Sequence, residues 1–310
     1  MSAQALMHNL EIQNNQQCLH DKLLRLTDAL IFNSVCVIHE PLTHRDIGCI
    51  NAAKYHLASG GHKVRAQLCI TAGLSLGMID NDIVIIAAVS ELLHNASLIH
   101  DDIQDGDINR RGIETVWKKF GKSTALCTGD LLLSAAYGVL ANFSQHSLIP
   151  RLIATIHQRT ATVIQGQSCD IIGKTIPVDN IAEYQNITIA KSGALLSLPL
   201  ELSLIGSQQS QALSLARQAA EYFALGYQIA DDLCDIEKDS ACNEQAESMN
   251  IVFVLKASGA IGNLKTLAVN LAIQNLDQSI ALSTMLPNHA GAALADLAKN
   301  LKTKLARENV

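Results

Sequence analysis

Two acidic clusters follow apolar segments of this chain, and both read DDxxD: Asp101, Asp102 and Asp105, and then Asp231, Asp232 and Asp235. In a helix, residues four apart lie on one face, so the outer aspartates of each cluster are neighbours. Neighbouring carboxylates repel each other unless a cation lies between them, and oxygen ligands with little else suit Mg²⁺. The repeat of this arrangement about 130 residues later predicts a metal site built from two helix ends.

A solvated helix end is the plain alternative for a single DDxxD cluster. The segment before the first cluster, 82–103, is almost wholly apolar, and the apolar GYQIA precedes the second. A buried helix gains nothing by ending in several charged residues unless these residues face a wet site. Two such ends with the same spacing therefore favour one bipartite metal site at the mouth of a buried cavity over two unrelated solvated ends.

Composition favours an all-α fold. The 310 residues include 5 Pro, are 48% hydrophobic and 17% charged, and are rich in helix formers. We expect a single domain over 1–310, a bundle of about ten or more helices around a central apolar cavity, with 1–16 frayed. Helices are expected at 17–36, 82–103 and 209–236, the second of them capped by Asp80, Asn81 and Asp82. Polar loops are expected at 104–122 and 237–249.

Charge and targeting signals predict a cytoplasmic protein. The net charge of −6 argues against a nucleic-acid binder. The eight cysteines have no regular spacing and mostly lie in apolar runs, which is typical of reduced core thiols. The first twenty residues lack the pattern of a secretory signal, and charged residues interrupt the most apolar stretches. We therefore expect no integral membrane segment.

Cations near the acidic clusters indicate a substrate that carries a diphosphate. Arg110 and Arg111 follow the first cluster, and Lys191 lies in the otherwise uncharged ITIAKSGALL, where a buried ammonium needs a partner. Mg²⁺ together with Arg and Lys is suited to a diphosphate leaving group. The chain contains no P-loop, GxSxG or HExxH motif. This combination favours loss of diphosphate from an apolar substrate.

From about Gly60 to Asp235, the chain resembles the trans-isoprenyl diphosphate synthases, the family of farnesyl, geranylgeranyl and longer polyprenyl diphosphate synthases. The most specific block is LIHDDIQDGDINRRGIETVWKKFGKSTALCTGDLLL, which contains the first acidic cluster, the Arg pair and a Gly-Asp. DDLCD matches the second aspartate-rich motif of the family, Lys191-Ser192 matches its Lys-Thr/Ser block, and Gly166, Gln167 and Asp170 match its GQxxD block. The resemblance implies an isoprenoid synthase-type fold and a homodimer.

The resemblance also implies the reaction and its metal ions. A prenyltransferase of this family condenses an allylic prenyl diphosphate with isopentenyl diphosphate, through ionisation of the allylic substrate and attack of the isopentenyl double bond. Asp101 and Asp105 would bind two Mg²⁺ ions and Asp231 a third, with Asp235 nearby and with Mn²⁺ as a substitute metal. The catalytic set implied in this way is Asp101, Asp102, Asp105, Lys191, Asp231 and Asp232.

Substrate-binding residues are implied in the same way. The allylic diphosphate would be held by Arg110, Lys191 and Gln228, with Ser192 beside Lys191. Isopentenyl diphosphate would be held by Arg65, His94 and Arg111. His94 has a satisfied core histidine as its plain alternative, and Gln167 and Asp170 either support the site or are structural.

Two departures from the family pattern concern substrate binding. The family usually has Gly-Gly-Lys-Arg-x-Arg-Pro, where this chain has Gly60, Gly61, His62, Lys63, Val64, Arg65 and Ala66. His62 therefore takes the place of a lysine that binds isopentenyl diphosphate, and Lys63 is the candidate substitute. After the second motif, the loop EKDSACNEQAESMNIVFVL has only Lys238 and lacks a lysine near Met249-Asn250.

Small residues before the first cluster predict a long product. Ala96 and Ser97 lie one turn deeper than Asp101, where farnesyl-type relatives commonly have bulky aromatic residues. We therefore expect a product of geranylgeranyl length or longer, with Leu93 or Tyr137 as the floor. Two other functions stay open: a related enzyme that ionises a prenyl diphosphate without chain elongation, and a non-catalytic subunit of a prenyltransferase.

Overall fold

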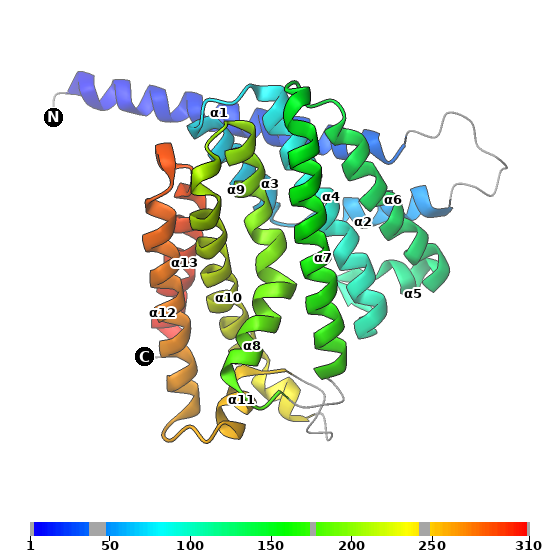
Figure 1. Ribbon diagram of the computed structural model, residues 1–310, viewed down its shortest axis with the longest axis vertical. Helices are drawn as coiled ribbons and strands as arrows, with labels where there is room; N and C mark the ends of the chain where they lie inside the picture. Colours follow the sequence, from blue (N-terminus) through cyan, green and yellow to red (C-terminus); the bar gives the residue numbers. More distant parts are fainter. Residues whose placement is uncertain (1–2, 37–47, 174–177, 242–248, 309–310) are drawn as a thin grey trace. The chain divides into compact units, whose positions relative to one another are not determined.

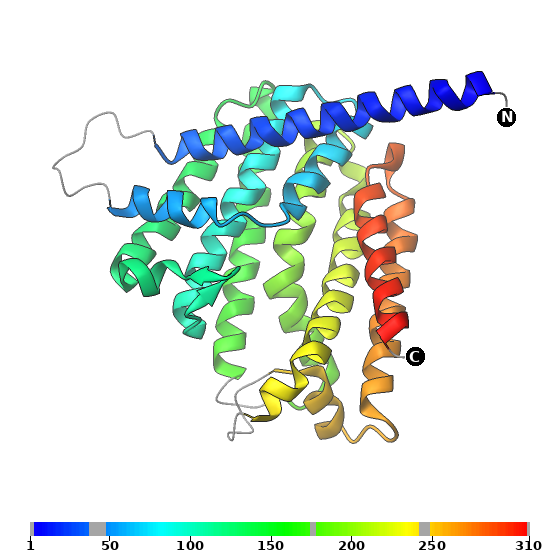
Figure 2. The same cartoon turned by 180° about the vertical axis from the view of Figure 1, so that it is seen from behind.

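The computed structural model describes residues 3–36, 48–173, 178–241 and 249–308, and these residues are mainly helical (Figures 1 and 2). The all-α prediction is confirmed. The strands in the described part of the chain are the two-residue β1, Asn109–Arg110, and β2, Ile113–Glu114, which pair antiparallel. The described residues group into two compact units, Met1–Ile149 and Pro150–Val310. The expectation of one domain over the chain stays a prediction.

The first unit is organised around one long apolar helix. Its helices are α1 (Ala3–Ser34), α2 (Gly48–Ala58), α3 (Val64–Ser75), α4 (Asp80–Asp105), α5 (Val116–Phe120) and α6 (Lys122–Leu140), followed by the short η1 (His146–Leu148). Helix α4 packs against α1, α3 and α6. Its residues from Asp82 to Leu93 are buried, because nearly all of them are apolar and helices cover more than one face. The acidic cluster is the last turn of this helix.

Helix α1 begins at Ala3, and the frayed start expected over 1–16 stays a prediction. The expected cap of the long central helix needs correction. Helix α4 begins at Asp80, and its N-cap residue is Ile79 without a side-chain cap. The Asp82 carboxylate is buried and accepts hydrogen bonds from the Ser144 backbone N–H at 2.9 Å and the Ser144 hydroxyl at 2.6 Å. Asp82 therefore ties α4 to the segment after α6.

The second unit is a bundle centred on one long helix. Its elements are α7 (Ile149–Gly173), α8 (Ile181–Thr188), η2 (Ile189–Gly193), α9 (Ala194–Gly206), η3 (Ser210–Ala212), α10 (Leu213–Ala241), α11 (Ile251–Ala257), α12 (Leu264–Thr284), η4 (Pro287–His289) and α13 (Ala292–Glu308). Helix α10 packs against α9, α11, α12 and α13, which lie beside it in both ribbon views. Because α10 extends to Ala241, it takes up the start of the loop expected at 237–249.

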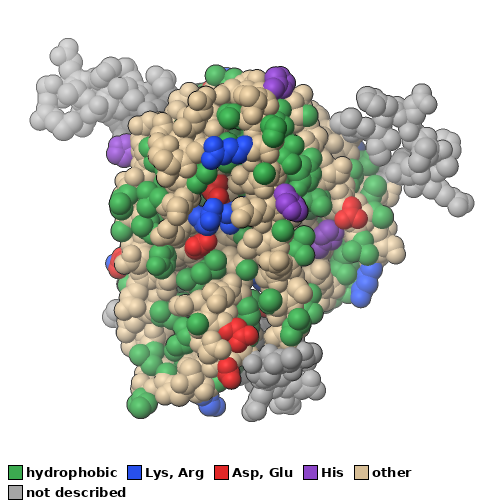
Figure 3. Space-filling model, in the orientation of Figure 1, with side chains coloured by type: hydrophobic (Ala, Val, Ile, Leu, Met, Phe, Trp, Pro, Cys, Tyr) green, Lys and Arg blue, Asp and Glu red, His purple; other side chains and the backbone are tan. Residues whose placement is uncertain are grey.

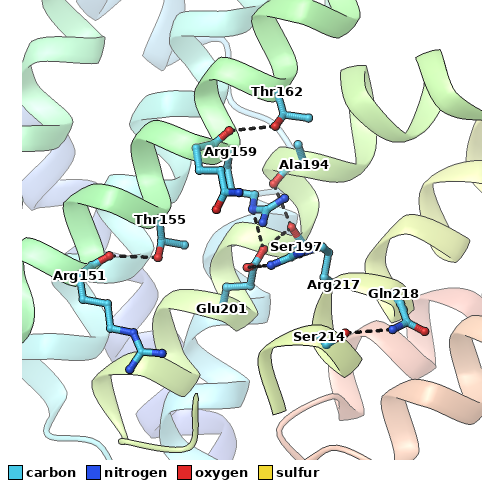
Figure 4. Close-up of polar contacts among 11 residues, drawn as sticks. Arg151, Thr155, Arg159, Thr162, Ala194, Ser197, Glu201, Ser214, Arg217 and Gln218 are labelled. Atoms are coloured by element: carbon cyan, nitrogen blue, oxygen red, sulfur yellow. Dashed lines mark hydrogen bonds and ion pairs between the residues drawn. The ribbon is translucent and has the colours of Figure 1, made fainter. Parts of the chain in front are cut away.

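A buried ion network connects three helices of the second unit (Figure 4). Arg159 of α7 lies 3.1 Å and Arg217 of α10 lies 3.4 Å from carboxylate oxygens of Glu201 in α9, whose side chain is 2% exposed. The Ser197 hydroxyl donates a hydrogen bond to Glu201 at 2.7 Å. Burial lowers the pKa of Arg159, and the nearby Glu201 opposes this shift. The network supplies the partners that a buried carboxylate requires.

Charged side chains are sparse on the face shown in Figure 3, where hydrophobic side chains are scattered among backbone and uncharged side chains of other types. Three helical segments are long and apolar enough by length and composition to cross a membrane: Asp80–Asp105, Lys122–Leu140 and Ile181–Gly206. In the first and third, 78% of the most apolar window is buried inside the protein, as in core helices of globular proteins. The expectation of no integral membrane segment stays a prediction.

The seven cysteines of the described residues are free thiols, as expected. Their expected place in the core was wrong for four of them, because Cys18, Cys127, Cys169 and Cys234 are exposed. Cys69 is buried, and desolvation raises its pKa to about 12. Cys242 lies outside the described residues.

Candidate active site

The first acidic cluster divides into outward and inward carboxylates at the end of α4. Asp101 is half-buried and Asp105 is exposed, four residues apart on one face of the helix, whereas Asp102 is buried. The helix ends at Gly106, whose φ of 74° is the left-handed conformation that glycine adopts without cost. The cluster therefore presents two carboxylates to its surroundings and turns the third towards the protein.

Asp102 holds the segment that follows the helix. The Arg110 guanidinium contacts one Asp102 carboxylate oxygen through Nε and Nη2, both at 2.6 Å, and Nη2 also lies 3.6 Å from Asp107. Burial raises the pKa of Asp102, and Arg110 counteracts this shift. Two charge-assisted contacts to one oxygen of a buried carboxylate anchor Arg110 and the segment around it. Arg110, expected to contact the allylic diphosphate, is thus already engaged by Asp102.

A tight hairpin presents Arg111. Strands β1 and β2 pair Arg110 with Ile113, so Arg111 and Gly112 form a two-residue loop with φ values of 52° and 80°. Positive φ at both loop positions is the type I′ turn that matches strand twist. The Thr115 hydroxyl and the Trp117 indole N–H both donate to the Asp107 carbonyl at 2.7 Å, which holds the base of the hairpin. The polar loop expected at 104–122 is therefore ordered, and includes α5.

Arg111 lies against the loop between α2 and α3. Its Nη1 donates a hydrogen bond to the Gly60 carbonyl and lies 3.5 Å from the Ser59 hydroxyl. A Cβ atom on Gly61 would lie 2.7 Å from the Arg111 Cζ, and Gly61 has a φ of 136°. Only glycine at this position leaves room for the guanidinium. The structure thus places the Gly60-Gly61 loop next to Arg111, although about 50 residues separate them in the sequence.

Two histidines lie in the same charged environment. Burial, followed by Arg65 and Arg111, holds the pKa of His94 well below its usual range, so its imidazole is neutral at pH 7. Burial and Arg111 lower the pKa of His56 to about 4, and the hydrogen bond of His56 to Asn95 opposes this shift. Of the residues expected to bind isopentenyl diphosphate, Arg65 and Arg111 are therefore close enough for their charges to act on His94.

Sequence reasoning missed His56. Its Nε2 lies 3.0 Å from Asn95 Oδ1, and Asn95 Nδ2 donates to the Glu91 carbonyl at 2.7 Å. Because the amide nitrogen is used in this way, His56 Nε2 is the donor in its own hydrogen bond. The available signal was a histidine three residues after Ala53 on the apolar stripe of a helix, which does not distinguish a core histidine from a site residue.

His62 and Lys63, which follow Gly61 where the family usually has Lys and Arg, have different surroundings. His62 is exposed, and its carbonyl accepts a hydrogen bond from Gln67 at 2.9 Å. Lys63 forms an ion pair with Asp28 of α1 and has a φ of 48°. To bind a diphosphate, Lys63 would have to leave or share Asp28.

The second acidic cluster repeats the pattern of the first. In α10, Asp231 is exposed, Asp235 is half-buried and Asp232 is buried. Asp232 accepts hydrogen bonds from Tyr184, Gln228 and the backbone N–H of Ile251. Burial raises the pKa of Asp232 to about 6, and these donors oppose the shift. Gln228, expected to contact the allylic diphosphate, donates to Asp232 at 2.8 Å.

Lys191 has the partner that its sequence context required. Its Nζ lies 2.5 Å from Asp170 of α7, and the segment around it, Ile189–Gly193, is a π-helical turn. Such turns are frequent at functional sites. Gly166 permits the close approach of α7, since a Cβ there would lie 2.5 Å from the Lys191 backbone nitrogen. Gln167 is buried, and its side-chain amide has no hydrogen-bond partner among the described residues.

The remaining predicted residues lie as follows. Ala96 and Leu93 are buried in α4, and the Ser97 hydroxyl donates to the His94 carbonyl at 2.8 Å. Tyr137 on α6 and Ser192 on η2 are half-buried.

The donor set of each cluster fits Mg²⁺. Within the described ranges, no group of three or more His, Cys, Asp or Glu side chains is arranged to hold a metal. Each cluster offers two outward carboxylates four residues apart, and oxygen is their donor atom. Mg²⁺ is usually bound through one or two carboxylates and completes its six ligands with water and substrate phosphate oxygens. Asp101, Asp105, Asp231 and Asp235 are the residues that could hold such ions.

Comparison with known proteins gives a consistent result. The family model for polyprenyl synthetase matches residues 48–247. The chain is 29% identical over 223 residues to geranylgeranyl pyrophosphate synthase, chloroplastic, of Catharanthus roseus, a match that covers 69% of this chain and 59% of that protein. It is 35% identical over 201 residues to farnesyl diphosphate synthase of Haemophilus influenzae, a match that covers 62% of this chain and 68% of that protein.

Solved structures share the fold. The geranylgeranyl pyrophosphate synthetase of Pyrococcus horikoshii aligns with a TM-score of 0.76 at 22% identity, over 94% of this chain and 99% of that one. A decaprenyl diphosphate synthase from Rhodobacter capsulatus aligns with a TM-score of 0.76 at 18% identity, over 92% and 99%. The likeness therefore extends beyond the sequence match to nearly the whole described fold.

Proposed function

Because this chain belongs to the polyprenyl synthetase family, we propose that it is a Mg²⁺-dependent prenyltransferase that condenses an allylic prenyl diphosphate with isopentenyl diphosphate. One observation carries the proposal. Within the family-matched residues, two helices carry acidic clusters, one at the end of α4 and one within α10, and each cluster keeps one carboxylate buried and turns two outward. Neither stability nor solubility requires that arrangement twice, whereas metal-assisted departure of a diphosphate does.

The outward carboxylates are the proposed metal ligands. Asp101 and Asp105 would hold two ions and Asp231 a third, with Asp235 beside it and with Mn²⁺ able to replace Mg²⁺. Bound metal would neutralise the diphosphate and so make it a better leaving group. The buried Asp102 and Asp232, expected to be catalytic, would serve by holding the segments around the metal ligands.

The cations of the chain would bind and orient the diphosphates. The cations Arg110 and Lys191 and the amide of Gln228 are assigned to the allylic diphosphate. Ser192 follows Lys191 in the chain, and Gln167 follows Gly166, the residue at which α7 approaches Lys191. Each of the first three has an acidic partner that also fixes its position. A cation held in this way keeps its place when the substrate arrives, so less conformational entropy is lost on binding.

Isopentenyl diphosphate is assigned to the positive cluster of the first unit. The charges of Arg65 and Arg111 both act on the neutral His94. Arg111 contacts the Gly60 carbonyl of the Gly60-Gly61 loop, which His62 and Lys63 continue. A neutral imidazole donates through one ring N–H without adding charge. The cluster thus combines two permanent cations with a hydrogen-bond donor, as a diphosphate anion requires.

The reaction follows from these assignments. The bond between the allylic carbon and the diphosphate oxygen breaks, and the diphosphate leaves with the bonding pair. The isopentenyl double bond forms the new carbon–carbon bond to the allylic cation. The released diphosphate accepts the proton that this carbon skeleton loses, which restores a double bond. The chain's own residues hold the two diphosphates and exclude water from the cation.

The proposed product has geranylgeranyl length or more. Ala96 and Ser97, one turn before Asp101, are small, and Ala96 is buried in the mainly apolar helix α4. The relatives named above include farnesyl, geranylgeranyl and decaprenyl diphosphate synthases, so the family covers several lengths.

We also propose that the protein acts in the cytoplasm as a homodimer. The free thiols of the described residues support a reducing compartment. Light scattering after size exclusion tests the assembly state.

Product analysis tests the function. We expect the pure protein, with Mg²⁺ and isopentenyl diphosphate, to elongate dimethylallyl, geranyl or farnesyl diphosphate. Asp101→Asn should lower this rate at least about a hundredfold, because a metal ligand is lost. Asp80→Asn, at the other end of α4, is the matched control and should leave the rate unchanged. Consumption of allylic substrate without elongation would instead support an ionising enzyme, and no reaction would support a non-catalytic subunit.

A further inference from the structure

Three elements of the second unit meet at one buried carboxylate, Asp232 of α10. The Tyr184 hydroxyl of α8 donates to Oδ2 at 2.7 Å, and the Ile251 backbone N–H at the start of α11 donates to the same oxygen at 2.8 Å. Gln228 donates to Oδ1 at 2.8 Å from one turn earlier in α10. Each carboxylate oxygen therefore already accepts a hydrogen bond from the protein, and Asp232 is 6% exposed.

Asn250 adds a second connection to the same residue. Its Nδ2 donates to the Asp232 carbonyl at 2.7 Å, and its Oδ1 accepts from the Val252 backbone N–H at 2.9 Å as the N-cap of α11. Asn250 is 1% exposed. Side chain and main chain of Asp232 are thus both bound by the segment that begins α11. The sequence has this asparagine where a lysine that contacts the allylic diphosphate was expected.

We infer that Tyr184 and Asn250 are positioning residues that, through Asp232, hold this part of α10 so that Asp231 and Asp235 face the metal. This inference rests on the proposed function. Asp231 and Asp232 are adjacent, and Asp235 lies one turn further on. A rotation of the helix at Asp232 would therefore turn both ligands away together.

The phenol of Tyr184 is well suited to this role. Its side chain is completely buried, so water cannot easily replace Asp232 as the acceptor of the hydroxyl hydrogen. The hydrogen bond to a carboxylate is of the stronger, charge-assisted kind. Burial, followed by the charge of Asp232, raises the pKa of Tyr184, so the phenol remains a donor throughout the working range of pH.

The alternative is that Asp232 is itself a metal ligand, and Tyr184→Phe separates the two roles by the sign of its effect. If Tyr184 positions the cluster, the variant loses one fixed contact and should need roughly tenfold more Mg²⁺, as expected for loss of a charge-assisted hydrogen bond. If Asp232 binds metal directly, the removal of a competing donor should leave the Mg²⁺ requirement unchanged or lower it.

The readout is binding rather than turnover. The melting temperature is measured with inorganic pyrophosphate while Mg²⁺ is varied, and the Mg²⁺ concentration at half of the total shift is compared between proteins. Tyr222→Phe is the matched control. Tyr222 is half-buried and lies on α10, the helix that carries Asp232, and its replacement should leave the Mg²⁺ requirement as in the unmodified protein. An unchanged or lowered Mg²⁺ requirement in Tyr184→Phe, or no Mg²⁺-dependent shift in the unmodified protein, would overturn the inference.

A second variant covers the case in which Tyr184→Phe fails to fold. Asn250→Ser keeps a hydroxyl that can cap α11 but loses the amide donor to Asp232, so it should also raise the Mg²⁺ requirement. If both single variants fold, the double variant should raise the Mg²⁺ requirement by less than the product of the two single increases, because both residues act through Asp232. The elongation assay is separate: its failure alone would remove the proposed reaction, while the Mg²⁺ shift would still decide the role of Tyr184.

Discussion

Asp102 and Asp232 show how neighbouring carboxylates of one motif take different roles. Successive helical residues are 100° apart, so Asp102 is turned away from Asp101, and Asp232 is turned away from Asp231 in the same way. Both middle residues point inwards and hold a later segment, through Arg110 in one case and through the start of α11 in the other. The motif in the sequence predicted the outer aspartates as metal ligands, but it did not show what Asp102 and Asp232 bind.

His56 is the residue whose surroundings were least expected. It is buried, and burial together with Arg111 keeps it uncharged at neutral pH. Its pKa falls from 6.5 to about 4 on folding, so the unfolded chain binds more protons between these values. Stability contributed by neutral His56 is therefore complete above pH 6.5 and is lost as the pH falls towards 4.

Replacement of His56 by glutamine should reduce acid sensitivity. The glutamine amide can still donate to Asn95, but it has no proton to gain. From the pKa shift, the free energy of unfolding of the unmodified protein should lose about 3 kcal/mol more than the variant between pH 6.5 and 4. Denaturant unfolding at several pH values measures this, and parallel pH curves would contradict the role assigned to His56.

Among the elements, η2 depends on a close approach by α7. The π-helical turn Ile189–Gly193 places Lys191 opposite Asp170, and Gly166 is the point at which the two backbones come together. The sequence contained the Gly-Gln block and the lysine but not their contact. A π-helical turn leaves no distinct periodicity in so short a segment, so it could not be predicted from the pattern.

Gly166→Ala should be destabilising although alanine favours helices. The new Cβ would lie 2.5 Å from the backbone nitrogen of Lys191, and backbone cannot yield as a flexible side chain does. We expect a loss of about 1–3 kcal/mol in the free energy of unfolding, together with weaker pyrophosphate binding. Thermal and denaturant unfolding measure the first effect, and calorimetry the second.

Gly173→Ala is the control in the same helix. A Cβ there would lie 3.7 Å from a methyl group of Val178, which is an ordinary contact. The change should be neutral or stabilising by no more than about 1 kcal/mol. Equal losses in the two variants would show that the contact at Gly166 does not hold Lys191.

At the scale of the whole molecule, the likeness to the family extends further in the fold than in the sequence. The family model matches 48–247, and the likeness of fold extends to nearly all of the chain. Solved structures named as a geranylgeranyl and a decaprenyl diphosphate synthase share this fold, so the fold alone does not predict a product length.

Ala96→Phe should therefore shorten the product. Ala96 is 4% exposed and lies on α4 five residues before Asp101, so a phenyl ring would occupy space next to the growing chain. Chromatography of dephosphorylated products from the two enzymes should show a shift of at least one isoprene unit. The melting temperature must be compared in parallel, because overpacking costs about 1–3 kcal/mol. Unchanged products from a folded variant would place the chain away from Ala96.

The sequence was sufficient to predict the all-α class, the long apolar helix before the first cluster, both acidic clusters and the family, because helix periodicity and motif spacing are local properties of a chain. Departures from this were the start of α4 at Asp80 and the ordered hairpin with α5 in the expected loop.

The partners of the charged groups were decided by the folded chain. Asp102 meets Arg110 eight residues on, Lys191 meets Asp170 across 21 residues, His56 meets Asn95 across 39, and Tyr184 meets Asp232 across 48. A carboxylate is equally compatible in sequence with a metal, an arginine or a tyrosine. Which of them it binds depends on burial and on the helix packed beside it, and these exist only once the helices have assembled.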